Sequence, residues 1–128
     1  MTEGGGAVAL WEGPRCRVFA VVVEGERCPA LAFLDGLNDR ASAGFEQRMD
    51  RLCRDGMIVN IEQFRQLHVS GRPVVYELKV HEPAALRLYV VRHGEDWAAT
   101  HGRKKPKDKN VAKEVERARD LYERRLSP

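Results

Sequence analysis

The chain has 128 residues, of which 43% are hydrophobic and 32% are charged. This composition provides a core beneath a heavily charged surface and argues against a disordered chain. The longest apolar run, residues 18–23, is far shorter than the roughly 18 residues that a membrane span requires. The N-terminus also lacks a basic region followed by a signal-like apolar stretch. We therefore expect neither membrane insertion nor export.

Charge is distributed unevenly along the chain. Residues 1–64 hold 7 basic and 10 acidic residues and the remainder holds 15 and 9, so the two halves carry net charges of −3 and +6. A separation of this kind favours a polyanion such as RNA as partner, although a solvated helix face would produce the same count. Cys16, Cys28 and Cys53 include no close pair, which is typical of a reducing, cytoplasmic location.

The first residues predict a leader and then a strand. Residues 1–13 contain a run of glycines and are expected to form a flexible leader, so that a single domain spans residues 14–128. Residues 15–24 contain a β-branched run that Gly25 ends, which predicts a strand covered on both faces.

Two helices are expected next. Pro29 suits a first helical position, and leucines at three-residue spacing predict a short helix over residues 30–37. Asn38 or Asp39 can cap a second helix that stops at residues 55–56. We expect these helices to form an αα-hairpin that covers one face of a sheet.

The second half of the chain changes to a period of two. Residues 57–67 are interpreted as a connection, and the alternation over residues 74–81 predicts a half-buried strand. Residues 86–91 predict its antiparallel partner, residues 97–101 a third short strand, and residues 110–126 a final helix. The expected fold is α+β: an antiparallel sheet of about four strands packed on an N-terminal αα-hairpin, with a C-terminal helix.

One face of the predicted hairpin of strands is polar. If the apolar alternate positions pack on the helices, the strand period places the remaining side chains together on the other face: Glu77, Lys79, His81, Arg87 and Tyr89. If the third strand neighbours the second, residues 101–105 reach the same surface. Cations on such a face can hold phosphates, and an aromatic ring can stack on an RNA base.

These segments resemble a known family. Tyr-Glu-Leu-Lys at residues 76–79, Leu-Arg-Leu-Tyr-Val at 86–90 and His-Gly-Arg-Lys-Lys-Pro at 101–106, in this order of elements, are similar to the RelE/ParE toxin superfamily, in particular its HigB-like, phage-derived branch. The resemblance implies a RelE-like fold and a toxin of a type II toxin–antitoxin system. Such a toxin is a ribosome-dependent endoribonuclease that cleaves translated mRNA without metal or cofactor. Its partner is a cognate antitoxin, a small helix-turn-helix protein.

The resemblance also implies roles for individual residues. Lys79, Arg87 and Lys104 match basic positions of the family; we expect Arg87 and Lys104 to be exposed and to stabilise the phosphate, with Lys79 or His101 as proton acceptor. Lys79 stands where the branch usually carries arginine, and a lysine among other cations can have a lowered pKa and serve as a base. Further RNA contacts are expected from His81, Tyr89, Arg103, Lys105 and Lys107.

Structural interpretations of the same residues stay open. Lys79 can be an ordinary partner of Glu77, Tyr89 can shield the sheet, residues 103–109 can be a solvated linker, and Trp97 is expected to be a packing residue. The four histidines lack the spacing of a zinc site. Two other functions remain: a ParE-like inhibitor of DNA gyrase, and a non-catalytic, phage-derived regulator that binds nucleic acid.

Overall fold

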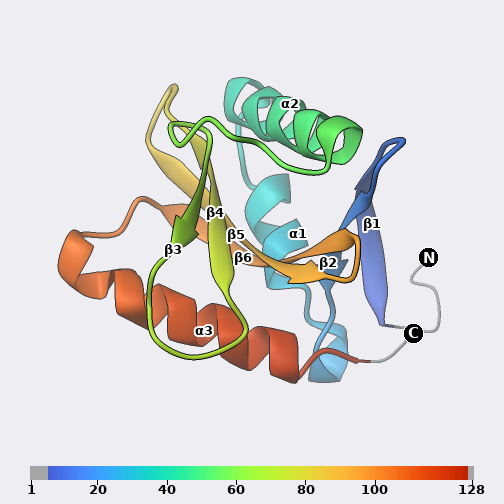
Figure 1. Cartoon of the computed structure of the whole chain (residues 1–128), viewed down its shortest axis with the longest axis vertical. Helices are drawn as coiled ribbons and strands as arrows, with labels where there is room; N and C mark the ends of the chain where they lie inside the picture. Colours follow the sequence, from blue (N-terminus) through green and yellow to red (C-terminus); the bar gives the residue numbers. More distant parts are fainter. Residues whose placement is uncertain (1–5, 127–128) are drawn as a thin grey trace.

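The computed structural model describes residues 6–126 and contains six strands and three α-helices within that range (Figure 1). Two single-turn 3₁₀ helices lie at Glu24–Glu26 and Asp108–Asn110. The strands are β1 Ala7–Glu12, β2 Arg17–Val21, β3 Phe64–Leu67, β4 Val75–Val80, β5 Leu86–His93 and β6 Asp96–Lys104. The helices are α1 Pro29–Asp35, α2 Asp39–Asp55 and α3 Val111–Glu123.

All six strands form one mixed sheet in the order β1-β2-β6-β5-β4-β3. Every neighbouring pair is antiparallel except β2 and β6, which run parallel and pair Val18 with Trp97. The expected antiparallel sheet of about four strands is therefore wrong in strand number and in direction. After β2 the chain forms the other elements and then returns, so that β6 lies beside β2. Periodicity within a strand carries no information on such long-range pairing.

The expected layout with an N-terminal αα-hairpin is also wrong, because two strands precede the helices. β1 occupies residues 7–12 of the expected leader, where Val8 and Leu10 pack, partly buried, against the main core. The strand does not alternate regularly, because a register shift interrupts it between Ala9 and Trp11, and the glycine run beside it indicated a flexible segment. Residues 1–5 of that leader lie outside the described residues.

The short strand β3 was not expected either. It lies within the segment that was interpreted as a connection and pairs antiparallel with β4 at the outer edge of the sheet. Its four residues, Phe-Arg-Gln-Leu, bury only the two ends, Phe64 and Leu67, so they contain no alternation that a period of two would detect.

The helices α1 and α2 lie on one side of the sheet (Figure 1) and begin where the sequence predicts. Pro29 is the first residue of α1, and the Asn38 side chain caps α2 by accepting a hydrogen bond from the Ala41 amide at 2.9 Å. Gly56 ends α2 in the left-handed conformation, with φ of 83°. The apolar side of α2 packs with Leu78, Val80 and other residues of the sheet into the main core.

The opposite side of the sheet is covered by α3 (Figure 1). Val115 and Ala118 of the helix pack on Val75, Tyr89 and Val91. The face that carries the predicted basic side chains is therefore partly closed by α3, which the expected fold did not provide for. No helix within residues 6–126 is long and apolar enough to cross a membrane.

Candidate nucleic-acid interface

Two rows of polar side chains cross the sheet face that α3 partly covers, and the strand register aligns them. The strand period predicted that Lys79, Arg87 and Tyr89 share this face, and the cross-strand pairs agree with it. The first row, here called the mixed row, consists of Arg65, Glu77, Tyr89 and His101 on β3 to β6. The second, here called the cationic row, consists of Lys79, Arg87 and Arg103 on β4 to β6.

A β-bulge in β6 decides which basic residues belong to this face. Val90 pairs with Ala99 and Tyr89 pairs with His101, which leaves Thr100 as the extra residue. After the bulge, His101 and Arg103 face α3, whereas Lys104 pairs with Leu86 and points to the other side. The prediction that Lys104 joins Arg87 is wrong, because a bulge reverses the alternation of every residue that follows it.

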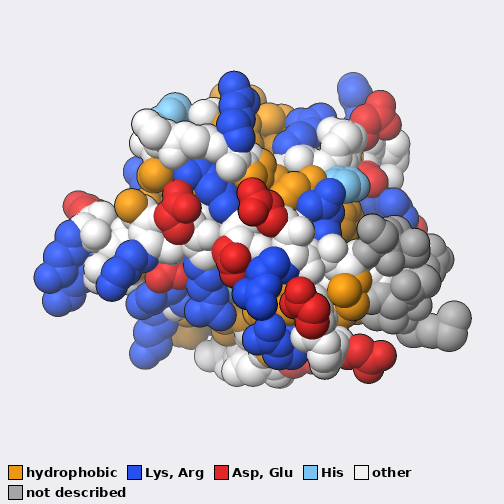
Figure 2. Space-filling view, turned by 90° about the horizontal axis from the view of Figure 1, so that it is seen from below, with side chains coloured by type: hydrophobic (Ala, Val, Ile, Leu, Met, Phe, Trp, Pro, Cys, Tyr) orange, Lys and Arg blue, Asp and Glu red, His pale blue; other side chains and the backbone are white. Residues whose placement is uncertain are grey.

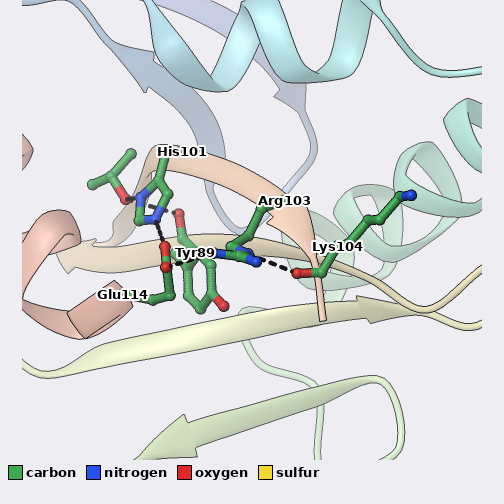
Figure 3. Close-up of polar contacts among 6 residues, drawn as sticks. Tyr89, His101, Arg103, Lys104 and Glu114 are labelled. Carbon is green, nitrogen blue, oxygen red and sulfur yellow. Dashed lines mark hydrogen bonds and ion pairs between the residues drawn. The ribbon is translucent and has the colours of Figure 1, made fainter. Parts of the chain in front are cut away.

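Glu114 of α3 binds two of these side chains at once (Figure 3). Its Oε1 accepts a hydrogen bond from His101 Nε2, and its Oε2 accepts one from Arg103 Nη1, both at 2.9 Å. His101 Nδ1 lies 3.2 Å from the Thr100 hydroxyl. In the same view the Lys104 side chain points away from this group. The contacts tie the first turn of α3 to the end of β6.

The protonation states follow from burial. Burial lowers the pKa of His101 to about 4, although its hydrogen bond to Glu114 acts in the opposite direction. Burial alone would raise the pKa of Glu114, but the hydrogen bonds from His101 and Arg103 outweigh it and leave that pKa lowered. At neutral pH a neutral imidazole therefore donates to an ionised carboxylate.

Glu77 pairs with two arginines of the two rows. Its carboxylate lies 2.9 Å from Arg65 Nη2 and 3.2 Å from Arg87 Nε. Arg87 is only 4% exposed, so the expectation that it is an exposed phosphate ligand is wrong; Glu77 compensates its charge inside the protein. Lys79 is 8% exposed, and burial together with Arg65 lowers its pKa.

Tyr89 does not present its ring to solvent. It is fully buried and stacks on His101 with the ring centroids 4.7 Å apart. The expected role as a stacking surface for an RNA base is therefore not available in this conformation. Burial raises the pKa of its hydroxyl, and the hydroxyl has no hydrogen-bond partner within the described part of the chain. A buried polar group without a partner is uncommon and marks a position where a ligand or water can bind.

The remaining candidates lie at the surface. His81 is exposed and its Nε2 is 2.6 Å from the Glu62 carbonyl oxygen. Lys104 is exposed at the end of β6, and Lys105 and Lys107 are exposed in the segment between β6 and α3. Trp97 packs in the main core, as the sequence predicts.

Sequence reasoning missed Glu114 as a site residue. A detectable signal exists, because Glu114 lies three residues after Val111 and four before Ala118, on the apolar stripe of the predicted helix. A carboxylate on a buried stripe needs a partner inside the protein. The sequence gives no means of naming His101 and Arg103 as those partners.

The charges on the α3 side are mixed. Seen from this side (Figure 2), acidic side chains lie among the lysines and arginines, so the expected basic surface is interrupted. The two rows together with Glu114 contain four cations and two carboxylates, so their net charge is positive. The cations are Arg65, Lys79, Arg87 and Arg103, and the carboxylates are Glu77 and Glu114. Among residues 6–126, no group of His, Cys, Asp and Glu side chains is arranged to hold a metal ion.

No protein-family model matches the chain, and no curated protein is significantly similar to it. Guanidinium and ammonium groups on three adjacent strands suit a phosphate and the charge that develops on it during phosphoryl transfer.

Proposed function

We propose that this chain is an endoribonuclease that cleaves translated messenger RNA, the toxin of a toxin–antitoxin pair. The cationic row carries the proposal. Lys79, Arg87 and Arg103 are register partners across three strands, so they lie side by side on one face of a rigid sheet rather than on a loop. The motifs in β4, β5 and β6 that resemble the toxin superfamily contain these three residues.

The proposed reaction is a transesterification within RNA. The 2′-oxygen attacks the adjacent phosphorus, its proton passes to a base, and the bond from phosphorus to the 5′-oxygen breaks as that oxygen takes up a proton. The products are a 2′,3′-cyclic phosphate and a 5′-hydroxyl. Arg103 stabilises the charge on the phosphate oxygens, and the buried Arg87 contributes its positive charge from the neighbouring strand. The lowered pKa of Lys79 supports a role for it in proton transfer.

Access to the row requires an exchange of partners. The side chains of Arg65 and Arg103 are 50% and 45% exposed, whereas that of Arg87 is 5% exposed. An RNA phosphate thus meets Arg103 of the cationic row and Arg65 of the mixed row first, and it replaces the carboxylate of Glu114 or Glu77 as their partner. The ion pairs keep the cations ordered until the substrate arrives.

The ribosome, the cytoplasm and an antitoxin belong to the same proposal. Their support is the resemblance of residues 76–106 to ribosome-dependent toxins and the three cysteines, which are unpaired in the structure. An antitoxin that covers the cationic row or blocks entry to the ribosome would silence the activity.

Expression of the chain alone tests the proposal. Growth should stop, and mapping of 5′ ends should show cuts within translated codons that carry 5′-hydroxyl groups. A purified translation system should give the same cuts when ribosomes are present. Intact messages in arrested cells would contradict the nuclease; inhibition of supercoiling by the purified protein would then indicate gyrase as target, and salt-dependent RNA binding without products a non-catalytic regulator.

A further inference from the structure

An open surface cavity lies at the other end of α3 from Glu114. It has a volume of about 640 Å³ and is formed where α3 ends, β4 begins and β5 ends. Its lining includes Arg72, Pro73, Val91, Arg92, Tyr122 and Arg125. Glu114 and Tyr122 are eight residues apart on the helix, which corresponds to about 12 Å along its axis. The cavity therefore does not share residues with the mixed row or the cationic row.

The wall that carries Arg72 is fixed by a buried side chain. Arg119 of α3 is 6% exposed, and its guanidinium donates hydrogen bonds to the carbonyl oxygens of Val69, Ser70, Gly71 and Pro73 at 2.8 to 2.9 Å. The loop between β3 and β4, which runs along α3 (Figure 1), is thus held against the helix. A site on this loop is ordered before a ligand binds.

Two arginines around the cavity, Arg72 and Arg125, have free hydrogen-bond donors. Arg125 donates one hydrogen bond to the Tyr122 carbonyl. Arg72 makes no side-chain hydrogen bond to the described residues, and neither of the two forms an ion pair with a carboxylate within residues 6–126. Arg92 is directed away from them, because Val91 beside it faces α3 whereas the Arg92 guanidinium lies over the Trp97 ring on the other face of the sheet. Glu123 lines the same cavity without pairing to Arg72 or Arg125. Each guanidinium has five donors in a planar array that matches phosphate oxygens.

The cavity also offers surfaces for a planar ring. The Arg125 guanidinium lies over the Tyr122 ring, 3.9 Å from its centroid, and the Tyr122 hydroxyl is fixed by His93 Nδ1 at 2.7 Å. Nucleic-acid bases stack on arginine planes of this kind. Pro73 and Val91 add apolar wall.

We propose that this cavity binds a nucleotide, with its phosphate on Arg72 and Arg125 and its base against Arg125 and the apolar wall. The volume falls in the range of about 300 to 1,000 Å³ that is common for small-molecule sites. The nucleotide is either a free nucleoside monophosphate or the phosphorylated end of a single-stranded RNA. The site is independent of the proposed nuclease.

Calorimetry on the full chain with AMP, adenosine, inorganic phosphate and an RNA hexamer with or without a 5′-phosphate tests the site. Saturable binding of AMP, at least tenfold tighter than that of adenosine or phosphate, assigns a free nucleotide. Tight binding of the 5′-phosphorylated hexamer, with weak AMP binding, assigns an RNA end. Absence of saturable binding by both, or equal binding of AMP and inorganic phosphate, overturns the proposal.

A matched set of variants locates the ligand. Arg72→Gln together with Arg125→Gln should weaken binding at least tenfold. Arg124→Gln, which alters an exposed arginine paired with Asp120 outside the cavity lining, should leave binding unchanged. Arg103→Gln should also leave it unchanged even where it abolishes RNA cleavage, so failure of the nuclease and failure of this site are distinguishable. Equal binding by the double variant and the wild type places the ligand elsewhere and overturns the assignment.

Discussion

Arg103 and Lys104 are neighbours in the chain but project from opposite faces of β6, because Arg103 pairs with Arg87 and Lys104 pairs with Leu86. The extra residue Thr100 determines which of the two residues faces α3. Residues of the same charge at adjacent positions therefore lie in different environments, and they form a natural pair for testing the cationic row.

Arg103→Gln should lower RNA cleavage by about 100-fold or more, the usual effect of removing one stabilising donor from the transition state. Lys104→Gln should retain cleavage within a few fold. The measurements are growth arrest on induction and the rate of message cleavage in a translation system. Both variants should keep wild-type circular dichroism. Loss of cleavage in Lys104→Gln with full cleavage in Arg103→Gln would refute the role of the cationic row.

His101 should make the protein less stable in mild acid. Its pKa is about 4 in the folded protein and 6.5 without the protein environment, so the unfolded chain binds more protons between these values. Acidification from pH 6.5 to 4 should therefore lower the free energy of unfolding, by about 3 kcal/mol from this group. The lowered pKa of Glu114 acts in the same direction. Urea unfolding at several pH values measures the slope.

The control replaces the titrating ring. His101→Gln can still donate to Glu114 but does not titrate, and it should flatten the dependence over this pH range. His68→Gln, at an exposed position, should keep the wild-type slope. An unchanged slope in His101→Gln would show that other groups dominate the acid sensitivity.

Arg119 should contribute strongly to stability although it is a charged residue outside the apolar core. Arg119→Met removes hydrogen bonds to four loop carbonyls and to Glu116, and should lower the free energy of unfolding by about 2 to 4 kcal/mol. Proteolysis within residues 69–73 should become faster. Arg117→Met, the same change at an exposed position of α3, should cost little, and equal losses in the two variants would contradict the role of the loop contacts.

Local patterns predicted the parts of the fold that depend on local interactions. The cap at Asn38, the helix end at Gly56 and the alternation in β4 and β5 each depend on a few neighbouring residues. The parallel pairing of β2 with β6 depends on contacts between residues about 80 positions apart. Neither segment contains a local pattern that indicates its partner. Strand β1 was missed for a local reason, because the neighbouring glycines indicated a flexible leader.

The candidate site divides in the same way. The period of two grouped Lys79, Arg87 and Tyr89, but it gives the face of a side chain and not its exposure. All three are buried: Tyr89 packs against α3, and Arg87 pairs with Glu77 inside the protein. The bulge at Thr100 has no sequence mark, so Lys104 was placed on the wrong face.

Gly102 allows α1 to approach β6 closely, and its replacement should be costly. A Cβ at this position would lie 2.2 Å from Cδ2 of Phe33, so Gly102→Ala should lower the free energy of unfolding by about 1 to 3 kcal/mol through overpacking. Phe33→Leu in the same chain removes part of the ring and should recover some of that loss. Gly36→Ala, where the nearest atom is 3.6 Å from the added carbon, is the control and should be nearly neutral. Thermal and urea unfolding of the wild type, of the single variants Gly102→Ala, Phe33→Leu and Gly36→Ala, and of the double variant measure these differences. An additive loss in the double variant would contradict the close contact, since residues that clash must couple.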